Sequence, residues 1–174
     1  MSTEAARDLS VATLAPSHDR ESFTCGAESL DRYLRTQASQ DMRRKANGVF
    51  VLSERAAPER ILGFYTLCAS ALSKGEVPES ARRLVPRYPL VNATLIGRLA
   101  VAREGQGRGL GAILLTDALR RAYSSASTVG SSMIVVDALD ERAVAFYVAH
   151  GFIRLPDSLR LVLPMSSIAG LTTS

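Results

Sequence analysis

The chain has 174 residues, of which 47% are hydrophobic and 22% charged, and its 21 basic and 17 acidic residues give a formal net charge of +4. These values are ordinary for one folded domain and exclude a disordered chain, a collagen-like chain and a repeat array. We expect a single domain over residues 1–174. Two cysteines without CxxC spacing and only two histidines exclude the usual zinc clusters, so no metal is expected.

The sequence contains no candidate export signal or membrane span. The first twenty residues lack an unbroken apolar core and carry the charged residues Glu4, Arg7, Asp8 and Asp19. The longest uncharged apolar-rich stretch, Ile61–Ser73, is too short to cross a bilayer. With cysteine usage that fits a reducing compartment, these features predict a cytoplasmic protein that does not associate with membranes.

The first half of the chain predicts a strand, a helix and a hairpin. An apolar segment at 9–14 is typical of a strand. From Ala27 to Arg44 the apolar residues recur three and four positions apart, which predicts one amphipathic helix. Asn47-Gly48 ends this helix, and the runs 49–52 and 61–72 then predict an antiparallel hairpin.

The second half alternates strands and helices after an exposed connection at 75–89, where Pro78 and Pro86 limit any helix to 76–84. We expect a strand, a helix, a strand, a helix and a strand at 91–101, 112–123, 133–136, 140–151 and 159–163. The all-apolar run 133–136 is typical of a strand covered on both faces. The whole order predicts the α/β (α+β) class.

A glycine-rich turn, Gln106-Gly107-Arg108-Gly109-Leu110-Gly111, joins the strand at 91–101 to the following helix. Three glycines let backbone N–H groups converge, and the helix N-terminus adds partial positive charge, so the turn suits a pyrophosphate. A plain strand-to-helix turn is the alternative. The position past the middle of the chain argues against a Rossmann fold, and the absence of Gly-Lys-Ser/Thr argues against a Walker A loop.

The pattern Gln106-x-x-Gly109-x-Gly111 resembles the acetyl-coenzyme A loop of the GNAT N-acetyltransferases, and DERAVAFYVAHGF at 140–152 resembles the last helix of that family. The resemblance implies a mixed, mostly antiparallel central sheet flanked by helices. It also implies that loop amides hold the pyrophosphate of acetyl-coenzyme A, while the preceding strand pairs with the pantetheine arm. The residues implied in coenzyme binding are Leu99, Ala100, Val101, Gln106, Gly107, Arg108, Gly109, Leu110 and Gly111.

Four longer segments, at 23–44, 63–72, 86–101 and 159–165, resemble the GNAT toxins of bacterial toxin–antitoxin pairs. That resemblance implies an enzyme that acetylates the α-amino group of aminoacyl-tRNA and so blocks translation. It also implies neutralisation by a ribbon-helix-helix antitoxin, which would bind operator DNA. A homodimer is expected, with 159–165 or 75–89 as its contact or as the antitoxin contact; a buried last strand explains 159–165 equally well.

Tyr147 is the candidate general acid, because the resemblance places it at the tyrosine of the last helix. A phenol with an ordinary pKa of about 10 is protonated at neutral pH and can donate to the leaving thiolate. From its spacing to Val144 alone, Tyr147 is better explained as a core residue. No base is assigned: Asp137 and Asp140 are as typical of a strand end and a helix cap, and His150 of a helix C-terminus.

Basic residues supply the candidate tRNA contacts, through the phosphates. They are Arg43, Arg44, Lys45, Arg82, Arg83, Arg87 and Arg98. The alternatives are solvated surface charge for the set and a structural ion pair for Arg98. Two other functions stay open: acetylation of a small amine or of a peptide or protein N-terminus, and a non-catalytic module that pairs with a DNA-binding partner, against which the retained coenzyme loop argues.

Overall fold

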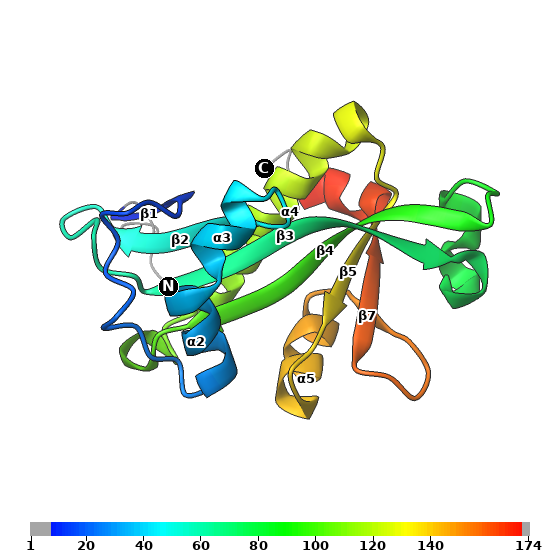
Figure 1. Cartoon of the computed structure of the whole chain (residues 1–174). Coiled ribbons are helices and arrows are strands. Elements are labelled where there is room, and N and C mark those ends of the chain that lie inside the picture. The colour runs from blue at the N-terminus through cyan, green and yellow to red at the C-terminus, as the bar shows by residue number, and fades with distance from the viewer. Residues whose placement is uncertain (1–7, 172–174) are drawn as a thin grey trace. The chain divides into compact units, whose positions relative to one another are not determined.

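The computed structural model describes residues 8–171, with the helices and strands arranged as in Figure 1. Within this range seven strands form one sheet in the order β1-β2-β3-β4-β5-β7-β6. The described chain divides into two compact units: one up to Leu67 with Arg98–Ala118, the other Cys68–Gly97 with the chain from Leu119 onward. The long strands β3 (Gly63–Ser73) and β4 (Leu90–Val101) contribute residues to both units.

The first unit is built on an antiparallel meander. Strands β1 (Leu9–Thr13) and β2 (Gly48–Glu54) pair with each other, and β2 pairs with β3 in the register that sets Val51 opposite Phe64. The predicted hairpin is therefore confirmed. Alternation along the strands turns Val51 and Phe64 to the same face, where they join one hydrophobic core cluster.

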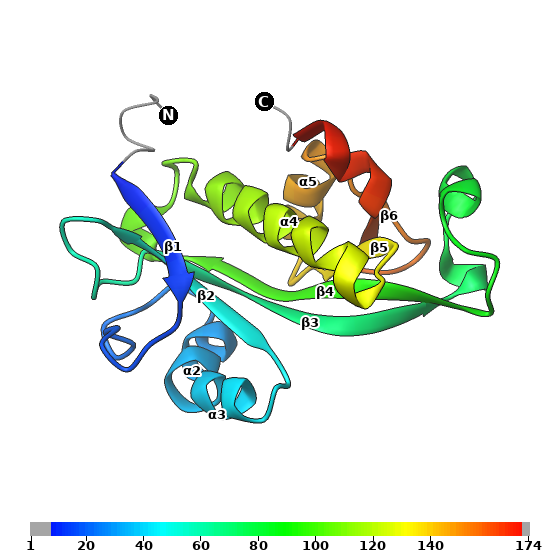
Figure 2. The ribbon, with the colours of Figure 1, turned by 90° about the horizontal axis from the view of Figure 1, so that it is seen from above.

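Two helices cover that face of the meander, on the opposite side of β2 and β3 from the first half of α4 (Figure 2). They are α2 (Glu28–Thr36) and α3 (Ala38–Arg43). The prediction of one helix from Ala27 to Arg44 was wrong, because the helix is interrupted at Gln37, whose φ of −119° departs from the usual helical value. The side chain of Gln37 donates to Asp41 across this break, and both helices present apolar residues to the core.

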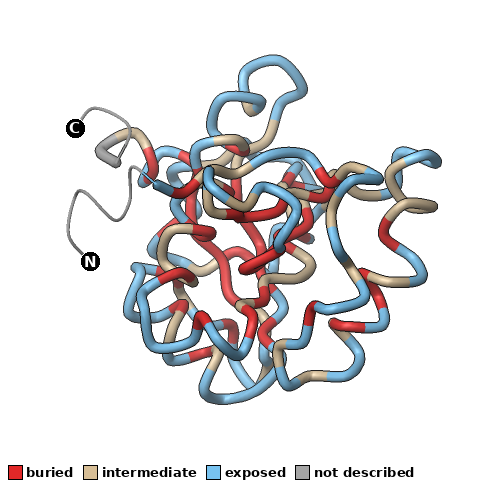
Figure 3. The backbone as a smooth tube through the Cα atoms, turned by 90° about the vertical axis from the view of Figure 1, so that its left-hand side faces the viewer, coloured by how far each residue is buried: buried red, intermediate tan, exposed pale blue. Residues whose placement is uncertain are grey.

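The second unit contains the parallel pair of the sheet. Strand β5 (Met133–Asp137) lies parallel to β4 and antiparallel to β7 (Arg160–Pro164), which also pairs with the two-residue strand β6 (Ile153–Arg154). The sheet is thus mixed and mostly antiparallel, as expected. Met133–Val136 are fully buried, which confirms the strand covered on both faces. Exposed residues gather in the connections (Figure 3).

Helix α4 (Leu110–Val129) begins at the glycine-rich turn and is longer than predicted, and α5 (Glu141–Ala149) follows β5. The sequence also failed to predict β6 and the terminal 3₁₀ helix at Met165–Leu171. Within residues 8–171 no helix is both long enough and apolar enough to cross a membrane. The same range holds no cluster of three His, Cys, Asp or Glu side chains that suits a metal.

The connection between β3 and β4 forms two short 3₁₀ helices, Lys74–Glu76 and Glu79–Leu84, rather than one helix at 76–84. Pro78 separates them, since its ring fixes φ and removes the N–H that a continuous helix needs. The connection leaves Leu84 and Tyr88 exposed, as is Leu90 at the start of β4. In contrast, Leu161–Met165 are buried, so the last strand is a core element, not a contact surface.

Candidate functional site

The turn between β4 and α4 presents a run of unpartnered backbone donors. Within the described chain, the N–H groups of residues 107–112 make no well-formed backbone hydrogen bond, while Ile113 N–H is the first to bond back, to Gly109 O at 3.4 Å. These six amides surround the N-terminus of a 20-residue helix whose first turn has no acidic residue. Aligned peptide dipoles add positive potential there. The turn therefore fits an anion with several oxygens, such as a pyrophosphate.

Two glycines make this turn possible through their backbone conformation. Gly107 has φ +82° and Gly109 has φ +76°, in the left-handed region that side chains disfavour. A Cβ at either position would meet no atom of the described residues within 4 Å, so the constraint is conformational strain and not crowding. The neighbouring Arg108 is exposed, whereas the side chain of Leu110 is buried and anchors the start of α4.

Gln106 fastens the turn to the rest of its unit. Its side-chain Nε2 donates to Cys25 O at 2.9 Å and to Val101 O at 3.1 Å, and its N–H donates to Arg103 O. Arg103 N–H in turn donates to Thr24 O at 2.8 Å. The side-chain donors of Gln106 are thus used within the protein, and its contribution to an anion site is to hold the turn in place.

Two further glycines, Gly63 and Gly105, were not predicted as part of the site. A Cβ at Gly63 would lie 2.8 Å from Ala100 O and 2.7 Å from Leu114 Cδ1, so only glycine lets β3 approach this part of β4. A Cβ at Gly105 would lie 2.7 Å from Leu110 Cδ1. Both crowded positions arise from tertiary packing, and no local motif in the sequence marks them.

Tyr147 lies on α5 in the second unit and is 6% exposed. Its ring packs edge to face against Phe146 and Phe152, with centroids 5.2 and 5.4 Å away. Burial raises the pKa of its phenol well above the ordinary value, so the group stays protonated. The hydroxyl of Tyr147 makes no hydrogen bond within the described chain. Because this oxygen is also not fully buried, it remains in contact with solvent.

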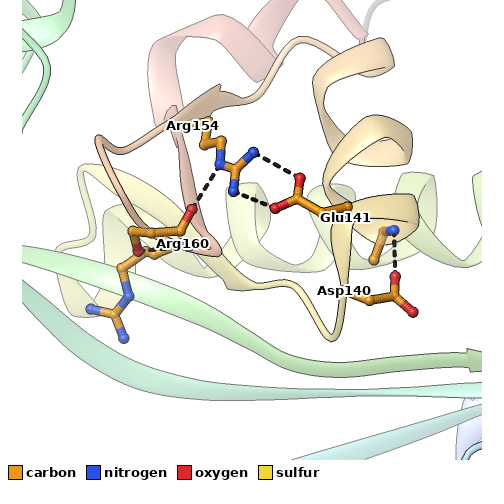
Figure 4. A network of polar contacts seen from close by, with 6 residues as sticks. Asp140, Glu141, Arg154 and Arg160 are labelled. Carbon is orange, nitrogen blue, oxygen red and sulfur yellow. Dashed lines mark hydrogen bonds and ion pairs between the residues drawn. The ribbon is translucent and has the colours of Figure 1, made fainter.

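The first turn of α5 is held by two side-chain interactions (Figure 4). Asp140 is the N-cap, and its Oδ1 accepts from Ala143 N–H at 2.9 Å. Glu141 forms a bidentate ion pair with Arg154 at 2.8 and 2.9 Å, and Arg154 Nε also donates to Ser158 O. These contacts tie the helix that carries Tyr147 to the β6–β7 hairpin.

The last turn of α5 ends as the sequence predicts. Gly151 adopts φ +92°, and Phe152 N–H donates to Tyr147 O at 3.1 Å. His150 Nδ1 bonds Phe146 O at 2.8 Å, and its ring lies against the Phe146 ring. His150 is therefore part of the helix terminus, as expected from its position.

The candidate bases also have structural partners. Asp137 ends β5 and accepts two hydrogen bonds from the Arg160 guanidinium, at 2.8 and 3.0 Å. Asp140 caps α5. The predictions that Asp137 ends a strand and that Asp140 caps a helix are confirmed. No carboxylate in the second unit is assigned as a base.

The basic residues fall into two classes. Six of the seven candidates are exposed: Arg43, Arg44, Lys45, Arg82, Arg83 and Arg87. Arg98 is half-buried in β4, forms no ion pair within residues 8–171, and lies over the ring of Tyr33 with Cζ 3.5 Å from the centroid. The structure thus gives Arg98 a stacked position in place of the ion pair considered from the sequence.

Comparisons with known proteins agree with this geometry. The acetyltransferase (GNAT) family model matches residues 16–152. A tRNA-acetylating toxin of Mycobacterium tuberculosis (strain ATCC 25618 / H37Rv) is 37% identical over 159 residues, which cover 91% of this chain and 93% of the relative.

Two solved structures are similar over nearly the whole chain. AtaT complexed with acetyl-methionyl-tRNAfMet has a TM-score of 0.86 and 33% identity, covering 95% of this chain and 100% of that one. A tyrosine-to-phenylalanine mutant of the AtaT toxin, bound to the C-terminus of the antitoxin AtaR and acetyl-CoA, has a TM-score of 0.81 and 30% identity, covering 96% and 99%.

Proposed function

The chain belongs to the acetyltransferase (GNAT) family, and we propose that it transfers the acetyl group of acetyl-coenzyme A to the α-amino group of an aminoacyl-tRNA. The observation that carries the proposal is the run of six unpartnered amides at residues 107–112. It occurs in a chain that is 37% identical to a tRNA-acetylating toxin. An acetylated α-amino group cannot accept a growing peptide, so the product blocks translation and the protein acts as a toxin.

Acetyl-coenzyme A supplies the acetyl group as a reactive thioester. The amides at 107–112 and the N-terminus of α4 hold its pyrophosphate, and Gln106 keeps these amides in place. The backbone of Leu99–Val101, at the end of β4, pairs with the pantetheine arm. Gly63 leaves β4 in position for this pairing, because any side chain there would press on Ala100.

Tyr147 donates the proton in the chemical step. As the neutral amine attacks the thioester carbonyl, the new C–N bond forms, the C–S bond breaks and the phenol proton passes to the leaving sulfur. Burial keeps the pKa of Tyr147 high, so the proton is present at neutral pH. An α-amino group beside an ester has a lower pKa than a lysine ammonium, and water can take its proton without a dedicated base.

The exposed basic residues bind tRNA phosphates, which predicts activity that falls steeply with salt. The partner proposed for control is a ribbon-helix-helix antitoxin that binds operator DNA; in support, the similar toxin AtaT is solved with the C-terminus of its antitoxin. We also propose that the protein forms a homodimer. We propose a cytoplasmic location, because charged tRNA is found and used in that compartment.

The test is transfer of radiolabelled acetyl from acetyl-coenzyme A to charged tRNA, to uncharged tRNA and to a panel of free amines and peptides. Wild type is compared with Tyr147→Phe and with the matched control Tyr123→Phe, which alters a partly exposed tyrosine of α4. Label on charged tRNA, lost by about 10²- to 10⁴-fold in Tyr147→Phe alone, supports the proposal.

Acetyl-coenzyme A affinity, measured by calorimetry, should be the same in all three proteins. Label on amines or peptides only would move the function to the second substrate class. Coenzyme binding without any transfer would favour a non-catalytic module. An unchanged rate in Tyr147→Phe would remove this residue from the acid role.

A further inference from the structure

The guanidinium of Arg98 is positioned by a neighbouring aromatic ring, without an acceptor of its own. Its Cζ lies 3.5 Å from the centroid of the Tyr33 ring, and Arg98 makes no hydrogen bond or ion pair within the described chain. A guanidinium carries five N–H donors in a planar fork. Arg98 is half-buried, so these donors are partly removed from water and an oxygen ligand would be favoured there.

The ring below Arg98 is fixed on its other sides. Tyr33 is buried on α2, its hydroxyl donates to Asp41 Oδ2 at 2.8 Å, and the Phe64 ring stacks with it at 6.4 Å between centroids. Asp41 is itself held by Gln37 Nε2 at 2.9 Å and Asn47 Nδ2 at 3.0 Å. Because the Tyr33 ring covers one face of the guanidinium, hydrogen bonds from Arg98 to a ligand would leave from its edge, where the N–H donors lie.

Hydrogen bonds from Gln37 and Tyr33 lower the pKa of the Asp41 carboxylate. The charge of Arg98 also lowers this pKa through space, but Asp41 does not pair directly with Arg98 within the described chain. Its two oxygens accept from Tyr33, Gln37 and Asn47, and it forms no ion pair with Arg98 in the described chain. The carboxylate therefore orients Tyr33, and Tyr33 orients Arg98. A planar fork with unused donors matches two oxygens of one phosphate.

The place of Arg98 in β4 relates this fork to the reaction. Arg98 directly precedes Leu99–Val101, the backbone proposed to pair with the pantetheine arm. Val101 follows Arg98 by three steps of extended strand, a distance of about 10 Å between their Cα atoms. The other six basic candidates are exposed side chains without such support.

We propose that Arg98, held flat by Tyr33, binds a phosphodiester of the single-stranded 3′ end of the charged tRNA. This inference rests on the proposed function and adds to it a defined phosphate subsite next to the acetyl donor. Arg98 is the contact residue, whereas Tyr33 and Asp41 are positioning residues. The subsite therefore favours aminoacylated nucleotide chains over simple amines as acetyl acceptors.

The experiment compares two small acceptors that carry the same amino acid. One is a 3′-aminoacyl adenosine, which has no phosphate; the other is a 3′-aminoacyl CCA trinucleotide, which has phosphodiesters. The measured quantity is the ratio of kcat/KM for the trinucleotide to kcat/KM for the adenosine. The proteins are wild type, Arg98→Gln, Arg98→Lys, Tyr33→Phe and, as matched control, Arg32→Gln, which removes an exposed arginine from the same helix as Tyr33.

We expect Arg98→Gln to lower this ratio by about 10- to 100-fold, the range for hydrogen bonds to charged groups. Arg98→Lys keeps the charge but loses the planar fork of donors, so it should lower the ratio less than Arg98→Gln does. Tyr33→Phe keeps the ring and loses only the bond to Asp41, so it should also lower the ratio less. Arg32→Gln should leave the ratio unchanged. KM for acetyl-coenzyme A should stay constant throughout, which separates this role from a merely structural one.

An unchanged ratio in both Arg98 variants, in enzymes that still acetylate charged tRNA, would overturn the inference and leave the proposed function standing. Failure of wild type to acetylate charged tRNA would overturn both. Thermal melting and acetyl-coenzyme A affinity check folding. If Arg98→Gln does not fold, Arg98→Lys and Tyr33→Phe decide, and an unchanged ratio in both refutes the subsite.

Discussion

Replacing Gly63 with alanine should weaken both the fold and coenzyme binding, because it pushes β3 away from β4. The added Cβ would lie 2.8 Å from Ala100 O and 2.7 Å from Leu114 Cδ1, both below the 3.0 Å that real Cβ contacts respect. The leucine methyl can rotate. The carbonyl oxygen belongs to the main chain and can move only if the strand shifts, at the segment proposed to pair with the pantetheine arm.

The size of the effect follows from two opposing terms. Overpacking a tight site costs about 1–3 kcal/mol, while a Gly→Ala change stabilises by about 0.4–1 kcal/mol through the unfolded chain. We expect a net destabilisation of roughly 1–2 kcal/mol. A strand shift of a few tenths of an ångström also misaligns the backbone groups beside Ala100, so the affinity for acetyl-coenzyme A should fall.

Urea unfolding followed by circular dichroism measures the first effect, and calorimetric titration with acetyl-coenzyme A measures the second. The matched control is Gly75→Ala, since a Cβ at Gly75 would lie more than 4 Å from every atom of the part of the chain that the structure describes, its chain neighbours aside. This control should be neutral or slightly stabilising and should bind the coenzyme normally. If Gly63→Ala unfolds at the same urea concentration as wild type and binds as tightly, the close approach of β3 to β4 is refuted.

Three further predictions concern the buried hydroxyl of Thr66 and the half-buried thiol of Cys25. The Thr66 hydroxyl is fully buried and has no hydrogen-bond partner among residues 8–171, so Thr66→Val should leave urea stability unchanged or raise it by about 1 kcal/mol; a clear loss would reveal a partner for this hydroxyl. Burial raises the pKa of the Cys25 thiol to about 11, so its alkylation by iodoacetamide should be slow at pH 8 and accelerate about tenfold per pH unit. Because the unfolded thiol ionises first, Cys25 should also lower stability as pH rises from about 9 to 11, an effect absent in Cys25→Ala. Rapid labelling at pH 8, followed by peptide mass spectrometry, would contradict the raised pKa of the half-buried Cys25 thiol.

Local patterns explain which parts of the fold were predictable. The hairpin of β2 and β3, the buried strand β5 and the cap at Asp140 depend on alternation, apolar runs and one side-chain bond. Each is encoded within a few neighbouring residues. The glycine turn was recognisable for the same reason, since Gly107 and Gly109 need their conformation locally.

The unpredicted parts depend on contacts between distant residues. Gly63 matters because Ala100 and Leu114 approach it, and Arg98 is stacked because α2 brings Tyr33 over β4. No rule based on sequence spacing predicts contacts between residues this far apart in the chain. The break at Gln37 was missed because the apolar period continues through it, although the backbone conformation does not.

The fastening of Gln106 has a consequence for the catalytic cycle. One side-chain amide ties the turn to Cys25 O and Val101 O, so the conformational entropy of the main chain leading into the turn is lost once, during folding. Ligand binding then does not need to order this chain again, which lowers the entropic cost of each binding event. An acetyltransferase must release coenzyme A and bind a new donor after every transfer. A turn that keeps its shape between ligands lets that exchange proceed without a folding step.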